Sequence, residues 1–195
     1  VIRAQVQGLS RQEAGWRVET TAGAFESAKV VVTAGAWSAR ILRPLGLRLP
    51  LQAERGYHVV FPEAEAELRN SVMDTDAKIV ASSMEMGLRA AGTAEFGDAD
   101  APADPARAAA VERALRGLVP RVGQGRVETW MGVRPSFPDS LPVIGEMPGM
   151  AGLYGGFGHS HWGFMMAPKT GDMLADLVTG ARVNMDLSAY SADRF

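Results

Sequence analysis

The residues with the clearest chemical potential lie in a glycine-rich segment, residues 152–163. It holds five glycines and, between the last two, His159 and His161. Such a density of glycine lets the backbone approach a ligand closely or adopt positive φ. An apolar run, residues 153–157, precedes the histidines and predicts a short strand. A helix that begins after this loop would present unpaired N–H groups and a partial positive charge, which suits electron-rich oxygens.

A helical pattern follows the loop. The positions of one apolar face recur at the spacing of an α-helix, namely Met166, Thr170, Met173, Leu174, Leu177 and Val178. Pro168 is expected in the first turn, and Gly180 is expected to cap the C-terminus. By glycine spacing alone, a plain strand–loop–helix connection is the simpler interpretation.

Four motifs occur in a fixed order around this loop, preceded by a fifth piece at residues 30–38, Val-Val-Val-Thr-Ala-Gly-Ala-Trp-Ser. The four are Trp130-x-Gly-x-Arg134-Pro, Pro138-Asp139-x-x-Pro142-x-Ile144-Gly145, Gly158-His159-x-x-x-Gly163 and Ala167-Pro-x-Thr-Gly171. Together they cover about half of the chain. In this order they resemble the C-terminal part of the FAD-dependent D-amino-acid oxidase superfamily, in its D-amino-acid dehydrogenase and glycine oxidase branch.

The resemblance implies FAD as cofactor, and together with the residue types it gives expected roles to twelve residues. The expected cofactor-binding residues are Ala34, Gly35, Ala36, Trp37, Gly158, His159, Ser160 and Gly163. The expected substrate-binding residues are Arg134, Tyr57, His161 and Trp162. No metal ligand and no certain catalytic side chain is implied.

Arg134 is the expected anchor for a substrate carboxylate, because a guanidinium matches a carboxylate with two parallel hydrogen bonds. A structural salt bridge at a strand end is the alternative. Tyr57 could equally be a half-buried strand aromatic, Trp162 could pack on the sheet, and a histidine in a glycine loop more often satisfies backbone groups. His161 stands where glycine oxidase-like proteins place a second arginine, and this difference weakens the expectation of glycine or sarcosine as substrate.

The remaining patterns predict a mixed architecture. Residues 1–6, 16–20 and those after Gly23 are expected to form a small antiparallel sheet, residues 29–33 a strand buried on both faces, and residues 38–45 a helix that Gly46 ends. Strands at 49–61, 71–74, 78–83, 87–93 and 126–133 should form an antiparallel sheet that packs a helix at 105–119, capped by Asp104. Residues 186–195 form a polar tail that we expect to be ordered only against a neighbour.

These patterns predict an α/β fold in which an α+β substrate domain is inserted into a Rossmann-like FAD-binding domain. Residues 1–46 and 136–195 would be pieces of the FAD-binding domain, and residues 47–135 the substrate domain. The chain contains no Gly-x-Gly-x-x-Gly after a strand, and it begins at Val1 within an expected strand. We therefore expect a missing N-terminal FAD-binding segment and predict that these residues alone bind FAD weakly or not at all.

Composition narrows the partners further. The net charge of −2 gives no nucleic-acid footprint. The absence of cysteine excludes disulfides, thiolate metal sites and a flavin attached through cysteine. No apolar run is long enough to span a membrane. A cytoplasmic location, with peripheral attachment at the inner membrane face as a variant, is the expectation.

The function that these residues favour is oxidation of the C–N bond of an amino acid, a D-amino acid first, by hydride transfer to flavin N5. That reaction requires the substrate carbon to be oriented and negative charge to be stabilised at the flavin N1–C2=O locus. Oxidation of a secondary amine such as sarcosine is a close variant. A non-catalytic domain that binds a small carboxylate or a partner without flavin is the alternative of a different class. The electron acceptor and the substrate side chain stay open.

Overall fold

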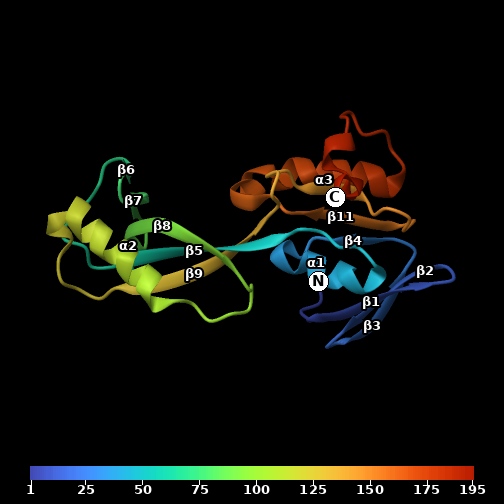
Figure 1. The fold of residues 1–195 in the computed structure, drawn as a ribbon, viewed down its shortest axis with the longest axis horizontal. Coiled ribbons are helices and arrows are strands. Elements are labelled where there is room, and N and C mark those ends of the chain that lie inside the picture. Colours follow the sequence, from blue (N-terminus) through green and yellow to red (C-terminus); the bar gives the residue numbers. More distant parts are fainter. The chain divides into compact units, whose positions relative to one another are not determined.

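The computed structural model describes residues 1–195, which divide into two compact units. Unit 1 comprises Val1–Ala53 and Arg134–Phe195, and unit 2 is the stretch between them, Glu54–Val133. The first boundary therefore falls after residue 53 rather than after residue 46, and the second falls two residues before the expected position. The chain enters unit 2 along β5 (Gln52–Phe61) and leaves it along β9 (Glu128–Ser136), which are neighbours in one sheet (Figure 1).

Unit 1 contains an antiparallel sheet of order β1-β2-β3, made of β1 (Val6–Gln12), β2 (Gly15–Thr20) and β3 (Gly23–Ser27). The predicted strand at residues 1–6 was wrong, since the strand begins at Val6. The hairpin register explains the shift, because Gln12 lies opposite Gly15 and residues 6–12 thereby pair with β2. Leu9 and Trp16 from this sheet are buried in the core of unit 1.

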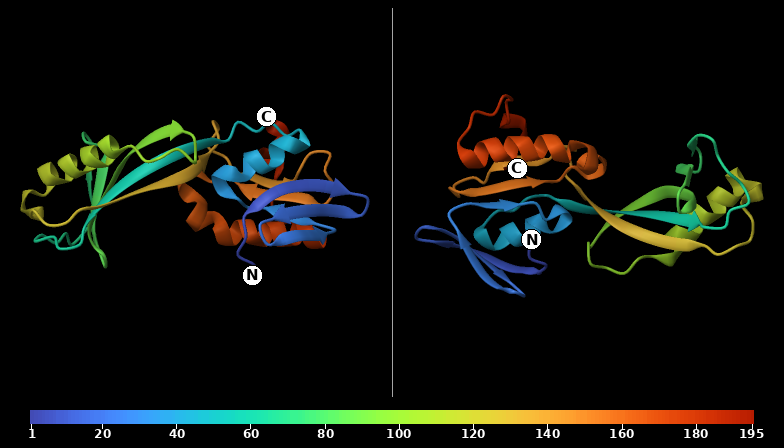
Figure 2. Two further views of the ribbon diagram at one scale, coloured as in Figure 1. Left: turned by 90° about the horizontal axis from the view of Figure 1, so that it is seen from below. Right: turned by 180° about the vertical axis from the view of Figure 1, so that it is seen from behind.

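A second sheet of unit 1 has the order β10-β11-β4 and consists of β4 (Val30–Val32), β10 (Val143–Glu146) and β11 (Leu153–Phe157). The central strand β11 runs antiparallel to β10 and parallel to β4. Helix α3 (Gly163–Thr179) packs on β10 and β11 (Figure 2). The expectation that the valine-rich strand is buried on both faces was wrong: Val31 is 39% exposed, because β4 lies at the sheet edge.

The end of β4 leads into a short helical stretch of η1 (Gly35–Trp37), α1 (Ser38–Leu42) and η2 (Arg43–Leu45). Gly46 ends it in the left-handed conformation, with φ of 95°, as expected for a C-terminal glycine. Gly180 caps α3 in the same way, with its N–H donated to the carbonyls of Asp176 and Leu177. The placement of Pro168 in the first turn was wrong, because α3 begins at Gly163 and Pro168 lies in its second turn.

Unit 2 is built on a five-stranded sheet of order β6-β7-β8-β5-β9, where β6 is Val72–Asp74, β7 is Ile79–Met84 and β8 is Gly87–Gly97. The pairs β6–β7 and β7–β8 are antiparallel. Helix α2 (Pro105–Leu118) packs on β7 and β8, and the Asp104 side chain caps it by accepting a hydrogen bond from the N–H of Ala106 at 2.9 Å. The predicted antiparallel sheet with a packed helix is confirmed.

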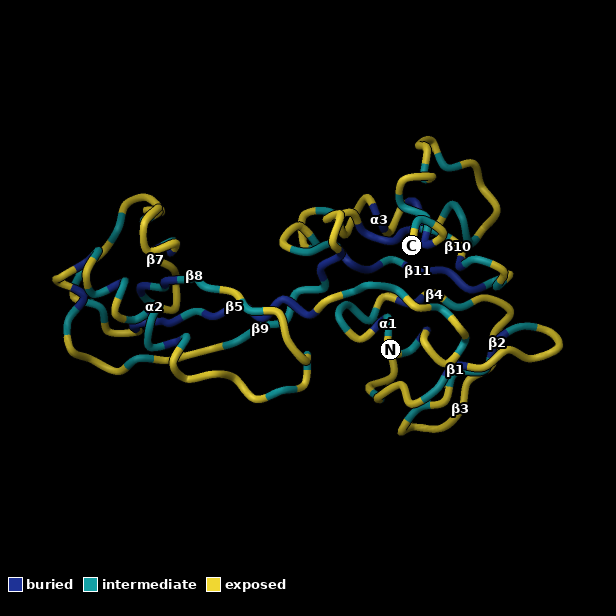
Figure 3. Tube along the Cα trace, viewed as in Figure 1, coloured by how far each residue is buried: buried dark blue, intermediate teal, exposed yellow.

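The core of unit 2 lies between α2 and one face of this sheet. Val111 and Leu115 of α2 are fully buried against Val59 and Phe61 of β5, and the short η3 (Pro120–Val122) closes the end of that core. Figure 3 shows the resulting contrast between buried β5 and the exposed loops around it. The Trp130-x-Gly132 motif also has a packing explanation here. A Cβ on Gly132 would lie 2.0 Å from the indole of Trp130, so only glycine permits that ring to cover the strand.

The tail at residues 186–195 is ordered against unit 1 itself, which corrects the expectation that it needs a neighbour. It forms two turns, η5 (Ser188–Tyr190) and η6 (Ala192–Arg194). Ala192 is 4% exposed and belongs to the same core cluster as Phe137 and Phe157. The sequence pattern of the tail is polar, but a few of its residues pack on the chain.

Candidate functional site

A pocket of about 320 Å³ lies in unit 1, where the ends of β4 and β11 meet the loop before α3. Its volume is at the lower end of the range of ligand pockets, roughly 300–1,000 Å³. We call it the glycine pocket. It is lined by Thr33, Gly35, Pro135, Gly156, Phe157, Gly158, His159, Ser160, Gly163, Ala167, Thr170, Gly171 and Leu174. Five of the eight predicted cofactor-binding residues are thus brought together, namely Gly35, Gly158, His159, Ser160 and Gly163.

Small residues make up much of the pocket wall, so backbone rather than side chain faces the space. Two glycines are required there by packing. A Cβ on Gly156 would lie 2.6 Å from Cδ1 of Leu174, and a Cβ on Gly158 would lie 2.2 Å from the ring of Phe137. Gly158 also has a φ of +88°, which side-chain-bearing residues rarely adopt. The loop backbone is therefore fixed close to both α3 and Phe137.

His159 is the half-buried polar group of the pocket. Its Nε2 lies 2.9 Å from the hydroxyl oxygen of Thr170, which is 5% exposed on α3. Burial lowers the pKa of His159 from the ordinary value of 6.5, so the imidazole is neutral at pH 7. The hydrogen bond holds this neutral ring and ties the loop to the helix.

Ser160 is held in an unusual backbone conformation beside the end of β9. Its φ is +51°, and its hydroxyl lies 2.9 Å from the hydroxyl of Ser136. Ser136 also forms an isolated antiparallel bridge with His159. A residue that carries a side chain and is held at positive φ costs on the order of 1–3 kcal/mol, and such residues cluster at functional sites. The loop is thus braced from β9 as well as from α3.

The N-terminus of α3 contributes to the same pocket. Gly163 is the first residue of the 17-residue helix and lines the pocket. The N-cap residue, Trp162, makes no side-chain hydrogen bond to the first turn. Because first-turn N–H groups have no partner within a helix and carry the positive end of its dipole, this edge of the pocket attracts partial negative charge.

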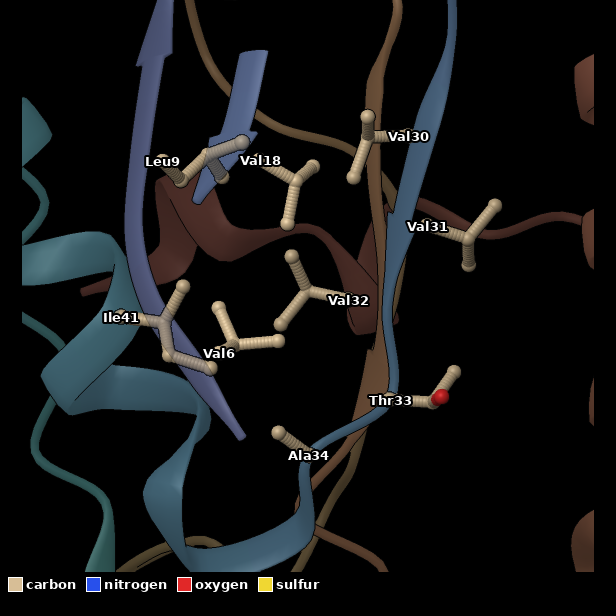
Figure 4. A pocket seen from close by; sticks show the side chains of 9 residues that line it. All are labelled: Val6, Leu9, Val18, Val30, Val31, Val32, Thr33, Ala34 and Ile41. Atoms are coloured by element: carbon tan, nitrogen blue, oxygen red, sulfur yellow. The ribbon is translucent and has the colours of Figure 1, made fainter. Parts of the chain in front are cut away.

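The structure does not bring the other three predicted cofactor residues into the glycine pocket. Ala34 lines a different cavity of about 340 Å³ together with apolar side chains such as Leu9, Val18 and Ile41. Figure 4 shows Val30, Val32 and Ala34 pointing into that cavity, while Val31 and Thr33 point to the opposite side of β4. Ala36 and Trp37 line neither cavity, and Trp37 is 40% exposed.

Three predicted substrate residues belong to unit 1 but do not line the pocket. Arg134 is half-buried and directly precedes Pro135, which does line it. His161 is exposed, and Trp162 is 58% exposed. His161 and Trp162 belong to the loop 158–163 and Arg134 lies near the end of β9, and the substrate-binding roles of all three stay predictions.

The fourth predicted substrate residue, Tyr57, lies in unit 2 and is 3% exposed. Its hydroxyl donates to Oε1 of Glu95 at 2.6 Å and accepts from the N–H of Asp104 at 3.0 Å. Glu95 also pairs with Arg55 at 3.4 Å and with Arg107 at 2.7 Å. The hydrogen bond from Tyr57, followed by the charges of the two arginines, lowers the pKa of Glu95. Contact with substrate stays a prediction for Tyr57, and it would require the hydroxyl to leave this network.

Several pocket residues were not predicted from the sequence. For one of them, Thr170, the sequence did contain an indication. Thr170 is a polar residue on an otherwise apolar helical face, and a buried hydroxyl requires a hydrogen-bond partner. The others carry little chemistry of their own, so only the fold identifies them. They are Thr33, Pro135, Gly156, Phe157, Ala167, Gly171 and Leu174.

Unit 1 is thus a layered α/β arrangement with a glycine-lined pocket at the N-terminus of α3. Residues 1–177 match the family described as FAD dependent oxidoreductase. The chain belongs to this family.

Individual relatives agree with this assignment. The chain is 37% identical over 182 residues to a protein named D-amino-acid oxidase from Bradyrhizobium diazoefficiens. This alignment covers 91% of the chain and 43% of that protein. It is also 37% identical to a D-amino acid dehydrogenase from Paramagnetospirillum magneticum, over 90% of the chain and 42% of that protein. The chain thus spans less than half the length of these curated relatives.

Solved structures resemble the fold over nearly the whole chain. Glycine oxidase from Geobacillus kaustophilus superposes with a TM-score of 0.86 at 28% identity, covering 98% of this chain and 52% of the other. Iminodiacetate oxidase from Chelativorans superposes with a TM-score of 0.75 at 26% identity, covering 94% of this chain and 51% of the other.

None of the helices in this chain combines the length and hydrophobicity needed to cross a bilayer.

Proposed function

We propose that this chain supplies the flavin-side loop and the substrate carboxylate anchor of an FAD-dependent amino-acid oxidoreductase. The observation that carries the proposal is the glycine pocket, which joins Gly35 at the end of β4 with the loop 158–163 at the start of α3. These two segments are 123 residues apart at their nearest ends (Gly35 and Gly158), and both belong to motifs that resemble the family.

The residues present fit a flat, electron-rich ring system. The wall is largely glycine and alanine, which leaves space for a planar group against the backbone. A Cβ at Gly35 or Gly171 would meet nothing within 4 Å, so these positions leave open space where a side chain could have been. A pocket of about 320 Å³ would hold only part of a dinucleotide, which supports the prediction that these residues alone bind FAD weakly.

Bound FAD would supply the two-electron acceptor for oxidation of an amine. The chain would contribute positioning and charge stabilisation. The N–H groups at the start of α3 would stabilise negative charge at the edge of the ring. His159, kept neutral by burial and held by Thr170, would maintain the loop without adding a positive charge of its own. The covering residues 158–163 would also limit access of water to the reacting atoms.

Arg134 would hold the substrate carboxylate. It lies near the end of β9, directly before two residues that reach the site, since Pro135 lines the pocket and Ser136 contacts Ser160. The curated relatives are named for D-amino acids, so a D-amino acid is the proposed substrate. Glycine, or a secondary amine such as sarcosine, is the variant that the glycine oxidase likeness suggests.

The test uses the natural-length protein and a dye as electron acceptor, with D-amino acids, their L-enantiomers and sarcosine as substrates. Arg134→Leu should lower kcat/KM by roughly 100-fold or more, because a desolvated charge-assisted pair is worth on the order of a few kcal/mol. Arg134→Lys should recover only part of this loss. Flavin content should stay near normal in both variants.

The contrary result is also clear. Near wild-type kinetics in Arg134→Leu, accompanied by a lower Tm, would assign Arg134 to a structural salt bridge. A natural-length protein that binds no flavin would support a non-catalytic carboxylate-binding domain instead. The location, cytoplasmic or attached at the inner membrane face, and the electron acceptor stay predictions that fractionation and acceptor assays would decide.

A further inference from the structure

The tail at residues 186–195 lies beyond the residues that match the family, which end at 177, yet Phe195 stacks on Phe137, whose ring lies against Gly158 of the glycine pocket. Its anchor is Ala192, which is 4% exposed and shares a core cluster with Phe137 and Phe157. The Ser191 hydroxyl caps the turn by accepting a hydrogen bond from the N–H of Asp193. The tail therefore has a defined position in unit 1.

Arg194 fixes the tail to the turn that follows β9. Its Nε pairs with Oδ2 of Asp139 at 2.7 Å, and its Nη2 donates to the carbonyl of Leu141 at 2.6 Å. The hydrogen bond from Arg194 is the main cause that lowers the pKa of Asp139. The Arg194 side chain is only 16% exposed, so this contact is not a fully solvated surface pair.

The same guanidinium lies against two aromatic rings. Its central carbon is 5.3 Å from the ring centroid of Phe137 and 4.3 Å from that of Phe195. The two rings stack on each other, with centroids 4.9 Å apart and planes inclined by 21°. Phe137 is 3% exposed, whereas Phe195 is 44% exposed and thus forms the outer layer of the stack.

Phe137 in turn supports the loop of the pocket. Its Cε2 and Cδ2 atoms occupy the space within 2.2 Å and 2.4 Å of where a Cβ of Gly158 would lie. Gly158 is followed by His159 and Ser160, which reach α3 and β9 through their side chains. A shift of the Phe137 ring must therefore move the backbone of Gly158 or open a gap beneath it.

We propose that Arg194 and Phe195 are positioning residues for the pocket loop 158–163 and that they act through Phe137. They clamp the ring from its outer face, while Gly158 rests on its edge. The consequence for flavin rests on the proposed function, whereas the effect on the loop does not.

The test measures amide hydrogen exchange of the natural-length protein that carries Phe195→Ala or Arg194→Leu. Removal of a stacked ring or of the cation above it should accelerate exchange of the amides at residues 158–162 roughly tenfold. Exchange in β11 at residues 153–155 should stay unchanged, because that strand is held by its own sheet. Phe195→Tyr keeps the ring and should behave as wild type, and Phe195→Leu offers a milder variant if Phe195→Ala does not fold.

Two controls separate positioning from general destabilisation. Phe25→Ala removes a ring of similar exposure, 40%, from β3 and should leave the loop unchanged. In the double variant of Phe195→Ala with Phe137→Leu, the acceleration at the loop should be less than the product of the single effects, because both act through one ring.

Flavin content gives the second measurement. Phe195→Ala should release flavin more readily than Phe25→Ala does. Unchanged loop exchange in both Phe195→Ala and Arg194→Leu would overturn the proposal, as would equal acceleration in the loop and in β11. If the wild-type protein carries no flavin, the proposed function fails, but the exchange result still decides the role of Arg194 and Phe195.

Discussion

His159 and Thr170 are joined by a hydrogen bond of 2.9 Å between Nε2 and Oγ1, which connects the pocket loop to the second turn of α3. The two residues are eleven positions apart, and both belong to motifs that otherwise look like separate signals. This bond makes the loop and the helix one structural element. It also explains why a threonine, rather than an apolar residue, lies on the buried face of α3.

Thr170→Val tests that bond, because valine has nearly the shape of threonine but no hydroxyl. We expect a loss of about 1 kcal/mol of unfolding free energy, the usual net value of such a hydrogen bond. Urea denaturation followed by circular dichroism measures it. An unfolding free energy of Thr170→Val equal to that of wild type would show that the bond contributes nothing.

The pH dependence of stability should report the buried imidazole. The folded-state pKa of His159 lies below the unfolded value of 6.5, so the folded state binds fewer protons in the interval between the two values. Its contribution is complete above pH 6.5 and is lost as the pH falls through that interval. His58 contributes in the same direction, through burial and then the charge of Arg89. Urea midpoints between pH 7.5 and pH 5 should fall less in His159→Gln than in wild type, and a parallel pH profile would contradict this assignment.

Gly171→Ala should raise stability while it weakens the pocket. Gly171 lies within α3, and a Cβ there meets nothing within 4 Å, so alanine should stabilise the helix by about 0.5–1 kcal/mol. The new methyl group would occupy a pocket-lining position, so flavin retention in the natural-length protein should fall. Gly117→Ala in α2 is the matched control, since it also meets nothing within 4 Å but lies in unit 2. Full flavin content in the Gly171→Ala protein would show that Gly171 does not line the flavin site.

Tyr57→Phe separates a structural role from a substrate role. Loss of the hydroxyl leaves the N–H of Asp104 without this partner and removes one hydrogen bond from Glu95, which keeps its pairs with Arg55 and Arg107, so unfolding free energy should fall by about 1–3 kcal/mol. KM for the amino acid should stay within about twofold of wild type, because a residue that does not contact the substrate contributes no binding energy to it. A large rise in KM with unchanged Tm would instead return Tyr57 to the substrate site.

Much of the architecture could be predicted from local pattern. The Asp104 cap, the Gly46 and Gly180 ends and the antiparallel sheet of unit 2 follow from side-chain chemistry within a few residues. The errors arose where tertiary context decides. The start of β1 depends on its pairing with β2, and the start of α3 depends on the loop before it rather than on Pro168.

The site could be predicted in part for the same reason. Glycine density identified the loop, and the family resemblance supplied Gly35. Ala34 and Gly35 are neighbours in one motif, so the sequence predicted the same role for both. In the structure, side chains alternate along β4 and beyond it, and Ala34 lines a different cavity from Gly35. The hydrogen-bond network around Tyr57 could not be predicted from the sequence, because Glu95 and Asp104 are distant in sequence from β5 and reach Tyr57 only through the fold.

Unit 2 is one uninterrupted stretch, and the strands on which it begins and ends, β5 and β9, are adjacent in its own sheet. A stretch whose two ends lie side by side can be exchanged as a unit, because the rest of the chain needs only to connect to two adjacent strands. Recombination among relatives that replaces residues 54–133 would therefore leave the glycine pocket, Arg134 and the tail intact. The inserted stretch and the glycine pocket would then evolve at separate rates.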